Sequence, residues 1–217
     1  MSNDSYKSES ICAISSPPGI GGVSLIRISG PDSFSIVEKI FSKSLKDTSG
    51  YQVLYGKIIE KKQIIDDVIV AVFKNPHSFT GENTVEINCH GSTFIQQKII
   101  ELLINNGARL ALPGEFSKRA FLNGKLDLSQ TEAIADLINS KSSAAHEIAI
   151  KQLKGGISSE LKVLRNKLIE FASLIELELD FSEEDVEFAD RTHLNQLIQD
   201  LITHIDQLKK SFQYGNA

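Results

Sequence analysis

Apolar residues recur at strand-like spacing in the first part of the chain and at helical spacing in the second part. Up to about residue 125, short apolar runs alternate with turns rich in Gly, Pro and Asn, and amphipathic helical segments lie between some of them. From about residue 128, apolar residues follow one another at three- and four-residue steps. The pattern predicts an α+β domain over residues 1–125, with a mixed or antiparallel sheet and helices on one face, followed by an all-α helical bundle domain over residues 126–217.

The first domain is expected to contain both strands and helices. Strands are predicted at residues 11–15, 23–29, 52–59, 64–73, 84–90 and 108–112, and helices at residues 30–41, 92–106 and 115–122. The stretch PGEFSKRAFLNGKLDL (113–128) contains the last of these helices and then a turn at Asn123-Gly124. We expect Phe116, Ala120 and Phe121 to form the buried side of that helix.

The second domain is predicted to be helical only. Ser129 and Glu132 have the spacing of a capping box, which marks the start of a helix. Gly155-Gly156 interrupts a long helical stretch, an acidic turn is expected at residues 181–188, and a further helix is expected from about residue 191 to residue 213. At least one more helix is needed to cover the apolar faces of this bundle.

Composition restricts where the protein works. The 217 residues are 41% hydrophobic and carry a net charge of -5, and the mean hydropathy is -0.09. No apolar run approaches the ~20 residues that a membrane helix needs, and the polar N-terminus lacks the apolar core of a signal peptide. Two cysteines are too few for a disulfide framework. We therefore expect a cytoplasmic protein that does not enter a membrane.

Charge is unevenly distributed along the chain. Residues 1–125 contain 14 Lys and Arg against 12 Asp and Glu, whereas residues 126–217 contain 9 against 16. A nucleic acid would find few cations to neutralise its phosphates in the second half. This balance argues against nucleic acid lying along the helical domain.

Arg27 is the first candidate for a binding site. It lies in a predicted strand with apolar residues on both faces, and such a strand is usually buried. A buried guanidinium needs an anionic or hydrogen-bonding partner. A purely structural pair with a carboxylate and a ligand site explain Arg27 equally well.

A second candidate set lies on the strand predicted at residues 84–90. Glu86, Asn88 and His90 face one way along this strand, and together they offer an acid, an amide and an imidazole that suit the donor and acceptor edge of a heterocycle. A solvated sheet face is the alternative that the spacing leaves open. Cys89 and His90 point to opposite faces, so they make a poor metal pair, and no zinc-site spacing occurs.

Lys125 is the third candidate, because it follows the Asn123-Gly124 turn and its ammonium can reach a carboxylate or a polar ligand. The alternative is that this stretch only connects two domains. The two roles are compatible, since ligand sites favour domain borders. Neither G-x-x-x-x-G-K-[ST] nor G-x-S-x-G occurs, so the 217 residues contain no P-loop and no serine-hydrolase motif.

Four stretches of the chain resemble the MnmE (TrmE) family of tRNA uridine modification GTPases. These are PPGIGGVSLIRISGP, PHSFTGENTVEINCHG, GARLALPGEFSKRAFLNGKLDLSQTEAIADLI and LDFSEEDVEF. They span nearly the whole chain in the family's order, and the PGEF to KLDL string is the most specific of them. The resemblance implies an N-terminal α+β domain that binds a tetrahydrofolate and forms a homodimer, followed by a helical domain into which a GTPase domain is inserted.

The resemblance also implies an activity for the full-length protein. It would hydrolyse GTP with potassium and magnesium, and would form a heterotetramer with the FAD- and NADH-using glucose-inhibited division protein A. The complex would add a carboxymethylaminomethyl-type group to C5 of the wobble uridine of certain tRNAs, with 5-formyl- or methylene-tetrahydrofolate supplying the one-carbon unit. The sequence stops where the GTPase domain is expected to begin, so we expect no GTP binding or hydrolysis by these 217 residues.

Three folate-binding residues follow from the resemblance, at matching motif positions. They are Arg27 in RISG, Glu86 in the strand before the His-Gly turn, and Lys125 in FLNGK. The resemblance assigns no catalytic residue and no metal ligand to this chain. Two departures bear on the pocket: Ile20 replaces the usual Arg of the glycine turn, and CHGS, ending at Ser92, replaces the usual G-H-G-G.

Two other functions compete with this assignment. One is a folate-dependent aminomethyltransferase-like enzyme, against which the acidic helical half and the complete PGEFSKRAFLNGKLDL string argue. The other is a non-catalytic scaffold in which Arg27 and Glu86 only pair with each other. Measured folate binding would exclude the scaffold.

Overall fold

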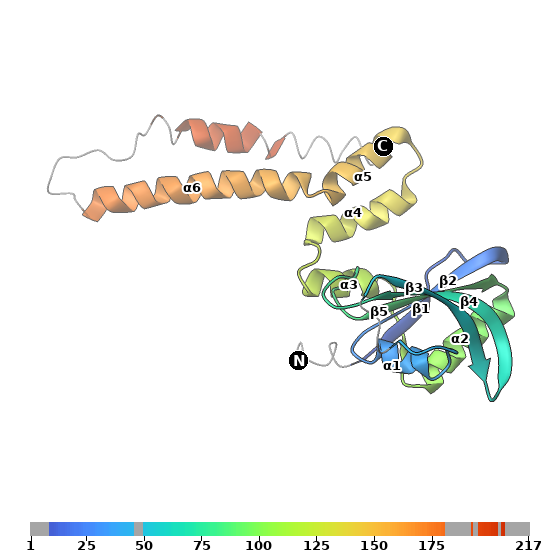
Figure 1. Ribbon diagram of the computed structural model, residues 1–217. Helices are drawn as coiled ribbons and strands as arrows, with labels where there is room; N and C mark the ends of the chain where they lie inside the picture. Colours follow the sequence, from blue (N-terminus) through green and yellow to red (C-terminus); the bar gives the residue numbers. More distant parts are fainter. Residues whose placement is uncertain (1–8, 46–49, 181–191, 193–194, 204, 207–217) are drawn as a thin grey trace. The chain divides into compact units, whose positions relative to one another are not determined.

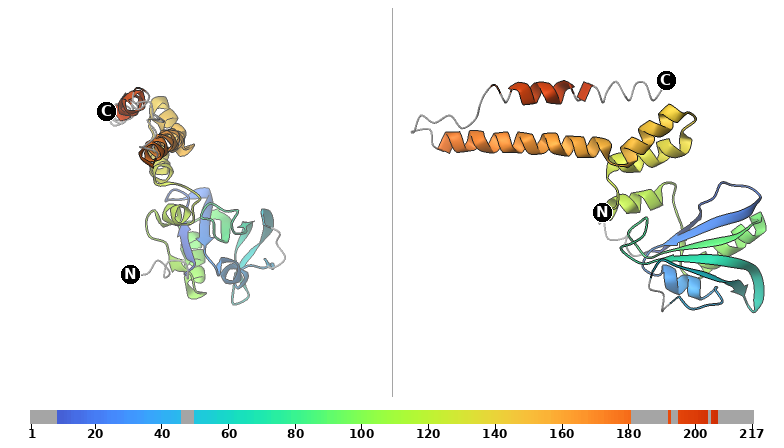
Figure 2. Two further views of the ribbon diagram at one scale, coloured as in Figure 1. Left: turned by 90° about the vertical axis from the view of Figure 1, so that its left-hand side faces the viewer. Right: turned by 45° about the horizontal axis from the view of Figure 1, so that its top comes forward.

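The computed structural model describes residues 9–45, 50–180, 192, 195–203 and 205–206. Backbone contacts divide the chain into two units, with the division between Leu126 and Asp127. The elements of the first unit, coloured blue to green in Figures 1 and 2, are β1 (Ile11–Ile14), β2 (Gly21–Ser29), α1 (Ser33–Glu38), β3 (Gln52–Glu60), β4 (Gln63–Phe73), β5 (Thr84–Gly91), α2 (Thr93–Asn105), β6 (Arg109–Leu110) and α3 (Glu115–Leu122). Those of the second unit are α4 (Leu128–Asn139), α5 (Ser143–Leu153) and α6 (Gly156–Asp180).

The strands of the first unit form one mixed sheet in the order β3-β4-β5-β2-β1-β6. Neighbouring strands are antiparallel except β1 and β6, which are parallel. The expected hairpin of β3 and β4 is confirmed, with Lys61 and Lys62 at its turn. Because β5 and β2 are the central strands, the residues that they carry lie away from both edges of the sheet.

The hydrophobic core lies between one face of this sheet and helices α1 and α2. Every second side chain of a strand faces the same way, and Ile26, Ile28, Val85 and Ile87 of the central strands are completely buried on the core face. Ile99 of α2 packs into the same cluster. The alternation that the sequence predicts for β5 is therefore confirmed.

Both cysteines belong to this core. Cys12 of β1 is 0% exposed and Cys89 of β5 is 2% exposed, and both thiols are free. Burial raises the pKa of each thiol to about 11, and the carboxylate of Asp66 adds to this effect at Cys89. The two side chains are therefore protonated at neutral pH and behave as small hydrophobic groups.

Two elements are shorter than the sequence predicts. The helix expected up to Phe41 ends at Glu38, because the chain after it pairs with the edge of β3. The backbone N–H of Ser42 donates to the carbonyl of Lys57 at 2.9 Å, which commits these residues to the sheet. The last strand, expected over 108–112, keeps only the two residues of β6.

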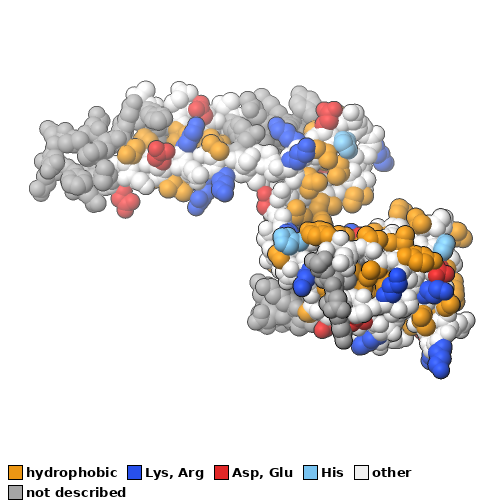
Figure 3. All heavy atoms as spheres, viewed as in Figure 1, with side chains coloured by type: hydrophobic (Ala, Val, Ile, Leu, Met, Phe, Trp, Pro, Cys, Tyr) orange, Lys and Arg blue, Asp and Glu red, His pale blue; other side chains and the backbone are white. Residues whose placement is uncertain are grey.

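The face of the sheet opposite the core is only partly covered. α3 approaches this face, since its Phe116 contacts Arg27, whose side chain points away from the core; the sequence predicted helices on one face alone. Over β3 and β4, four large side chains remain exposed, and we call them the open sheet face: Tyr51 (67%), Val53 (69%), Tyr55 (62%) and Ile69 (46%). Hydrophobic side chains reach the surface of the unit in Figure 3.

The N-cap of helix α4 in the second unit lies two residues before the predicted one. Asp127, not Ser129, is the N-cap: its carboxylate accepts a hydrogen bond from the backbone of Gln130 at 2.8 Å, and the Gln130 side chain accepts one from the backbone of Asp127 at 2.9 Å. Ser129 and Glu132 already lie inside the helix. The capping box predicted from the sequence exists, but it is formed by Asp127 and Gln130.

Within the described residues, the rest of the second unit consists of helices joined by short turns. α6 runs over 25 residues, and its Phe171 and Ile175 pack with Leu197 in a small cluster. The acidic turn expected at 181–188 lies outside the described residues. Of the helix expected over 191–213, residues 195–203 are described and are helical. Within the described part of the chain, no helix combines the length and the apolar character that a membrane crossing requires.

Candidate functional site

Arg27 and Glu86 form an ion pair at the centre of the sheet. They are direct cross-strand neighbours on β2 and β5. Nε of Arg27 donates to Oε1 of Glu86 at 2.8 Å, and Nη2 lies 2.7 Å from the same oxygen. The side chains are 23% and 21% exposed, so the pair is reachable from solvent but largely desolvated. Both contacts use Oε1 of Glu86, and neither engages Oε2.

Two phenyl rings enclose the guanidinium of this pair. The ring centre of Phe79 lies 5.4 Å from Cζ of Arg27, and that of Phe116 lies 5.6 Å from it. We call Phe79 and Phe116 the aromatic clamp. Phe79 comes from the loop of residues 74–83 and Phe116 from α3, so the clamp has two separately anchored halves. A cation beside two aromatic faces is stabilised by the negative potential of the rings.

The sequence prediction for the buried side of α3 is confirmed for Ala120 and wrong for Phe121, because two charged residues lie on this side. Glu115, Arg119 and Ala120 are buried, whereas Phe121 is 40% exposed. Phe116 is half-buried and faces Arg27 instead of the core. The prediction took the most apolar side of this helix as the buried one. The side that faces inward is instead the one on which Glu115 and Arg119 form ion pairs.

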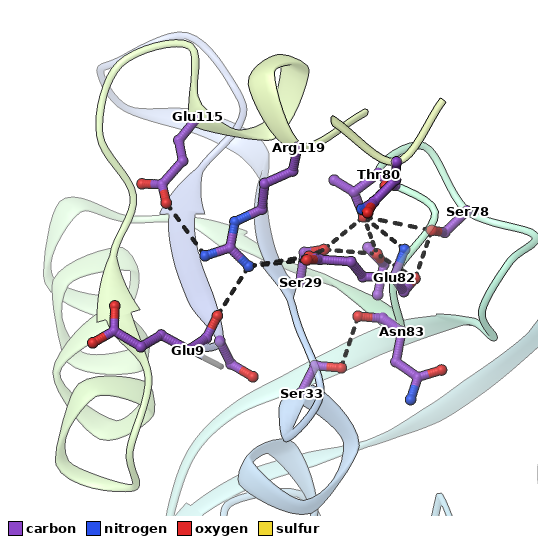
Figure 4. Close-up of polar contacts among 12 residues, drawn as sticks. Glu9, Ser29, Ser33, Ser78, Thr80, Glu82, Asn83, Glu115 and Arg119 are labelled. Atoms are coloured by element: carbon purple, nitrogen blue, oxygen red, sulfur yellow. Dashed lines mark hydrogen bonds and ion pairs between the residues drawn. The ribbon is translucent and has the colours of Figure 1, made fainter. Parts of the chain in front are cut away.

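Arg119 lies at the centre of a buried polar network (Figure 4). Its Nη1 lies 3.2 Å and 3.1 Å from the two carboxylate oxygens of Glu82 and donates to the backbone carbonyl of Glu9 at 2.9 Å. Its Nη2 donates to Oε1 of Glu115 at 3.3 Å. The Arg119 side chain is 3% exposed. The network thus joins α3 to the 74–83 loop and to the segment that precedes β1.

The 74–83 loop is fixed by hydroxyl groups around Glu82. Oγ of Ser29 donates to Oε2 of Glu82 at 2.8 Å, and it also lies 2.7 Å from Oγ1 of Thr80. Oγ of Ser78 donates to the backbone carbonyl of Glu82 at 2.6 Å. These contacts hold the end of the loop against β2, as Figure 4 shows. Sequence patterns do not predict the contacts of Ser29, because this residue lies 53 positions before Glu82.

Glu115 is the most strongly perturbed acid of the site region. Burial raises the pKa of its carboxyl, but hydrogen bonds from Arg109 and from the backbone N–H of Leu112, the charge of Arg109 and a further bond from Arg119 together lower it to about 2. Arg109 contacts both oxygens of Glu115, at 3.0 Å and 2.7 Å. The hydrogen bond to Glu115 is also the main cause that raises the pKa of Arg109. Glu115 is therefore ionised at any physiological pH.

Lys125 lies beside the loop that carries Phe79. Its Nζ donates to the backbone carbonyl of Pro76 at 3.1 Å, and the side chain is exposed. A Cβ on Gly81 would lie 3.2 Å from Cγ of Lys125, so the lysine stem runs against the loop. Asn123 reinforces this contact by donating to the carbonyl of Thr80 at 2.8 Å. The structure thus brings Arg27 and Glu86 into direct contact, and it joins Lys125 to the same region through the loop.

The predicted row along β5 is only partly available for binding. Glu86 is occupied by Arg27, and Asn88 is half-buried. His90 is held by Asp66 of β4, whose carboxylate lies 2.7 Å from Nδ1 and accepts the backbone N–H of His90 at 2.8 Å. Asp66 was not singled out from the sequence. Among the described residues, no group of three or more His, Cys, Asp and Glu is arranged to hold a metal ion.

Comparisons with known proteins cover both units. The family model described as "GTP-binding protein TrmE N-terminus" matches residues 10–125, and the model described as "MnmE helical domain" matches residues 128–217. Among curated relatives, the "tRNA modification GTPase MnmE" of Parabacteroides distasonis is 54% identical over 95% of this chain, and that of Cytophaga hutchinsonii is 53% identical over 96%.

A third relative of the same name, from Flavobacterium johnsoniae, is 51% identical over 96% of this chain. The matched part is 46% of the relative in each of these three cases, so the chain spans about half the length of the curated relatives it matches. The two family models follow one another along the chain in the order of the two structural units. The chain therefore belongs to the MnmE (TrmE) family.

Proposed function

We propose that this chain is the N-terminal and helical part of a tRNA modification GTPase. The relatives carry that name, and the chain matches them over nearly its whole length. In the full-length protein, GTP hydrolysis with potassium and magnesium would take place outside these 217 residues, and an FAD-dependent partner resembling glucose-inhibited division protein A would complete the enzyme. Its product would be a tRNA with a carboxymethylaminomethyl-type group on C5 of the wobble uridine.

We further propose that the first unit binds a tetrahydrofolate, in the 5-formyl or methylene form, at Arg27, Glu86 and Lys125. The observation that carries this proposal is the half-buried Arg27–Glu86 pair beside two phenyl rings, in which neither contact engages the second carboxylate oxygen of Glu86. When bound, the folate would supply the one-carbon unit of the modification.

The donor set fits such a ligand. A carboxylate accepts the N–H and amino donors of a pterin, and phenyl rings stack on flat heterocycles. Arg27 and Lys125 offer cations to carbonyl or carboxylate oxygens of the ligand. The fixed 74–83 loop would order one wall of the site before the ligand arrives, which reduces the entropy lost on binding.

Lys125→Ala should weaken binding of 5-formyltetrahydrofolate by about tenfold and leave the melting temperature of the ligand-free protein nearly unchanged. A charged hydrogen bond to the ligand contributes about 1.5 kcal/mol at the low end of its range, whereas an exposed cation contributes little to folding. Isothermal titration calorimetry measures the first quantity and thermal unfolding the second. Lys43→Ala, which removes another exposed lysine, is the control. Equal affinities of Lys125→Ala and the parent would reduce Lys125 to a connector.

The scaffold remains the second candidate, because Arg27 and Glu86 do pair with each other. In that case the pair would only hold β2 to β5. The parent protein decides between the two functions: saturable folate binding excludes the scaffold, and its absence at millimolar folate favours it.

We also propose that the first unit forms a homodimer through the open sheet face. Val53, Tyr55 and Ile69 would otherwise leave a cluster of large apolar side chains in water, which is typical of an interaction surface. A second copy would bury the same residues on both sides of a twofold axis.

Ile69→Glu should convert this dimer to a monomer. A carboxylate at the centre of the interface would be desolvated twice, once in each copy, and this cost exceeds what its lost apolar area contributed. Light scattering at micromolar concentration gives the mass. Ile138→Glu, at a 78% exposed position of α4, is the matched control and should not change the mass. A parent protein that is already monomeric at this concentration would end the dimer proposal.

A further inference from the structure

We propose that Arg119 is a positioning residue for the folate site: through Glu82 it holds the two halves of the aromatic clamp around Arg27. The inference rests on the proposed folate binding at Arg27 and Glu86. Arg119 itself is buried and would not touch the ligand. Its role would be to fix Phe79 and Phe116, which do face the site.

The positions of the four residues along the chain support this role. Phe79 precedes Glu82 by three residues in the loop, and Phe116 precedes Arg119 by three residues in α3, which is close to one helical turn. The ion pair between Arg119 and Glu82 therefore joins the two elements at a short distance along the chain from each ring. Figure 4 shows Arg119 extending from α3 towards Glu82, with Glu115 on its other side.

Glu82 transmits the position of Arg119 to the loop. Its carboxylate is held by Arg119 and, on the β2 side, by Oγ of Ser29. Thr80 adds a further restraint between Phe79 and Glu82, because it contacts Ser29 and accepts the side chain of Asn123 at its carbonyl. Without the ion pair between Arg119 and Glu82, the loop keeps its contact with Asn123 at the end of α3 but loses the link nearest to Glu82, and Phe79 is held less firmly over Arg27.

Stability alone is a weak explanation for a buried arginine here. Replacing buried ion pairs by apolar residues of similar volume is often neutral or stabilising. Moreover, Nε of Arg119 is buried without a hydrogen-bond partner among the described residues, and an unpaired buried donor lowers the contribution of the network to folding stability. What the guanidinium does provide is a rigid fork that reaches two other segments at once, at Glu9 and Glu82, and also pairs with Glu115 of its own helix.

Arg109 offers a matched control. It also donates to Glu115, at 2.7 Å, and it also contacts Glu9, at 2.8 Å, but its remaining contact is with Leu110 at the edge strand and not with the loop. Lysine at either position keeps the charge and loses the fork. A difference between Arg119→Lys and Arg109→Lys in ligand binding therefore isolates the link to the loop.

The test is a double-mutant cycle, read by calorimetric titration of the 217-residue chain with 5-formyltetrahydrofolate well below the melting temperature of every variant. Arg119→Lys is expected to raise Kd about tenfold, and Arg109→Lys by less than about twofold. Phe79→Ala should also raise Kd. In the Phe79→Ala background, Arg119→Lys should add less than about twofold, because the ion pair with Glu82 holds the ring of the loop, Phe79, in place, whereas Phe116 is carried by α3 itself.

The outcomes separate the inference from the function on which it rests. A parent that does not bind the folate overturns both. A parent that binds, with Arg119→Lys binding equally well or with fully additive effects in the cycle, overturns only the role of Arg119. If Arg119→Lys does not fold, Glu82→Gln replaces it: an amide keeps one acceptor oxygen but loses the negative charge and the second acceptor that Arg119 contacts, so a weakening of binding in the same direction is expected.

Discussion

Glu115→Ala should lower the free energy of unfolding of the first unit by about 3–5 kcal/mol, which is the cost of breaking a buried ion pair by removing one partner. Glu115 is 3% exposed and accepts hydrogen bonds from Arg109, Arg119 and the backbone of Leu112. Without it, Arg119 stays buried with a smaller share of negative charge around it. Urea denaturation followed by circular dichroism measures the loss.

The matched control is Glu147→Ala on α5, an exposed acid whose removal should change the free energy of unfolding by less than about 0.5 kcal/mol. The effect of Glu115 also depends on pH in a defined direction. Its pKa is lowered from an ordinary value near 4.5 to about 2, so its contribution to stability is fully present above pH 4.5 and is lost as the pH falls towards 2.

The shift of the Glu115 pKa corresponds to roughly 3 kcal/mol. The difference in stability between the parent and Glu115→Ala should therefore shrink by about this amount between pH 7 and pH 2. A difference that stays constant over this range would show that Glu115 contributes by packing and not by its charge.

Glu86→Gln should weaken binding of 5-formyltetrahydrofolate by about 2–3 kcal/mol, or roughly 30- to 150-fold in Kd. An amide has one acceptor oxygen in place of two, so it cannot bind Arg27 and two pterin donors together. It also leaves the half-buried Arg27 without its anion. Calorimetric titration measures the change in affinity.

Glu101→Gln, on the exposed surface of α2, is the control for Glu86→Gln and should bind as the parent does. The scaffold function predicts a different result. If Arg27 and Glu86 serve only to join β2 and β5, Glu86→Gln lowers the melting temperature while the folate affinity stays the same. Such a result would remove Glu86 from the site.

Local sequence patterns predicted the elements of the fold well where neighbouring residues in the chain determine the structure. The alternation along β5, the limits of α3 and the β3–β4 hairpin all follow from the spacing of apolar residues and from turn residues. The predicted end of α1 was wrong, because the true end depends on pairing of the following residues with β3, and no local sequence signal encodes that pairing. The cap of α4 was displaced by two residues because Asp127 and Ser129 are both good N-caps, and the spacing alone does not rank them.

The site was predictable only in part, for a related reason. Arg27 and Glu86 are neighbours because β2 and β5 share a register, and strand order is a property of the whole sheet. The inward face of α3 was misassigned because Arg119 is neutralised by Glu82, 37 residues earlier. The spacing of apolar residues predicts that such an arginine is exposed to solvent. Arg119 is buried because it forms an ion pair with a residue that is distant in the sequence.

The two buried thiols give the first unit an internal probe of its own opening. Cys12 and Cys89 are protonated and inaccessible in the folded sheet, so an alkylating reagent modifies them only when the strand that carries each one separates from its neighbours. β1 lies next to the short edge strand β6, whereas β5 lies between β4 and β2. Modification rates resolved by peptide mass would thus report fraying near the β6 edge separately from opening at the centre, where Glu86 is located, without any added label.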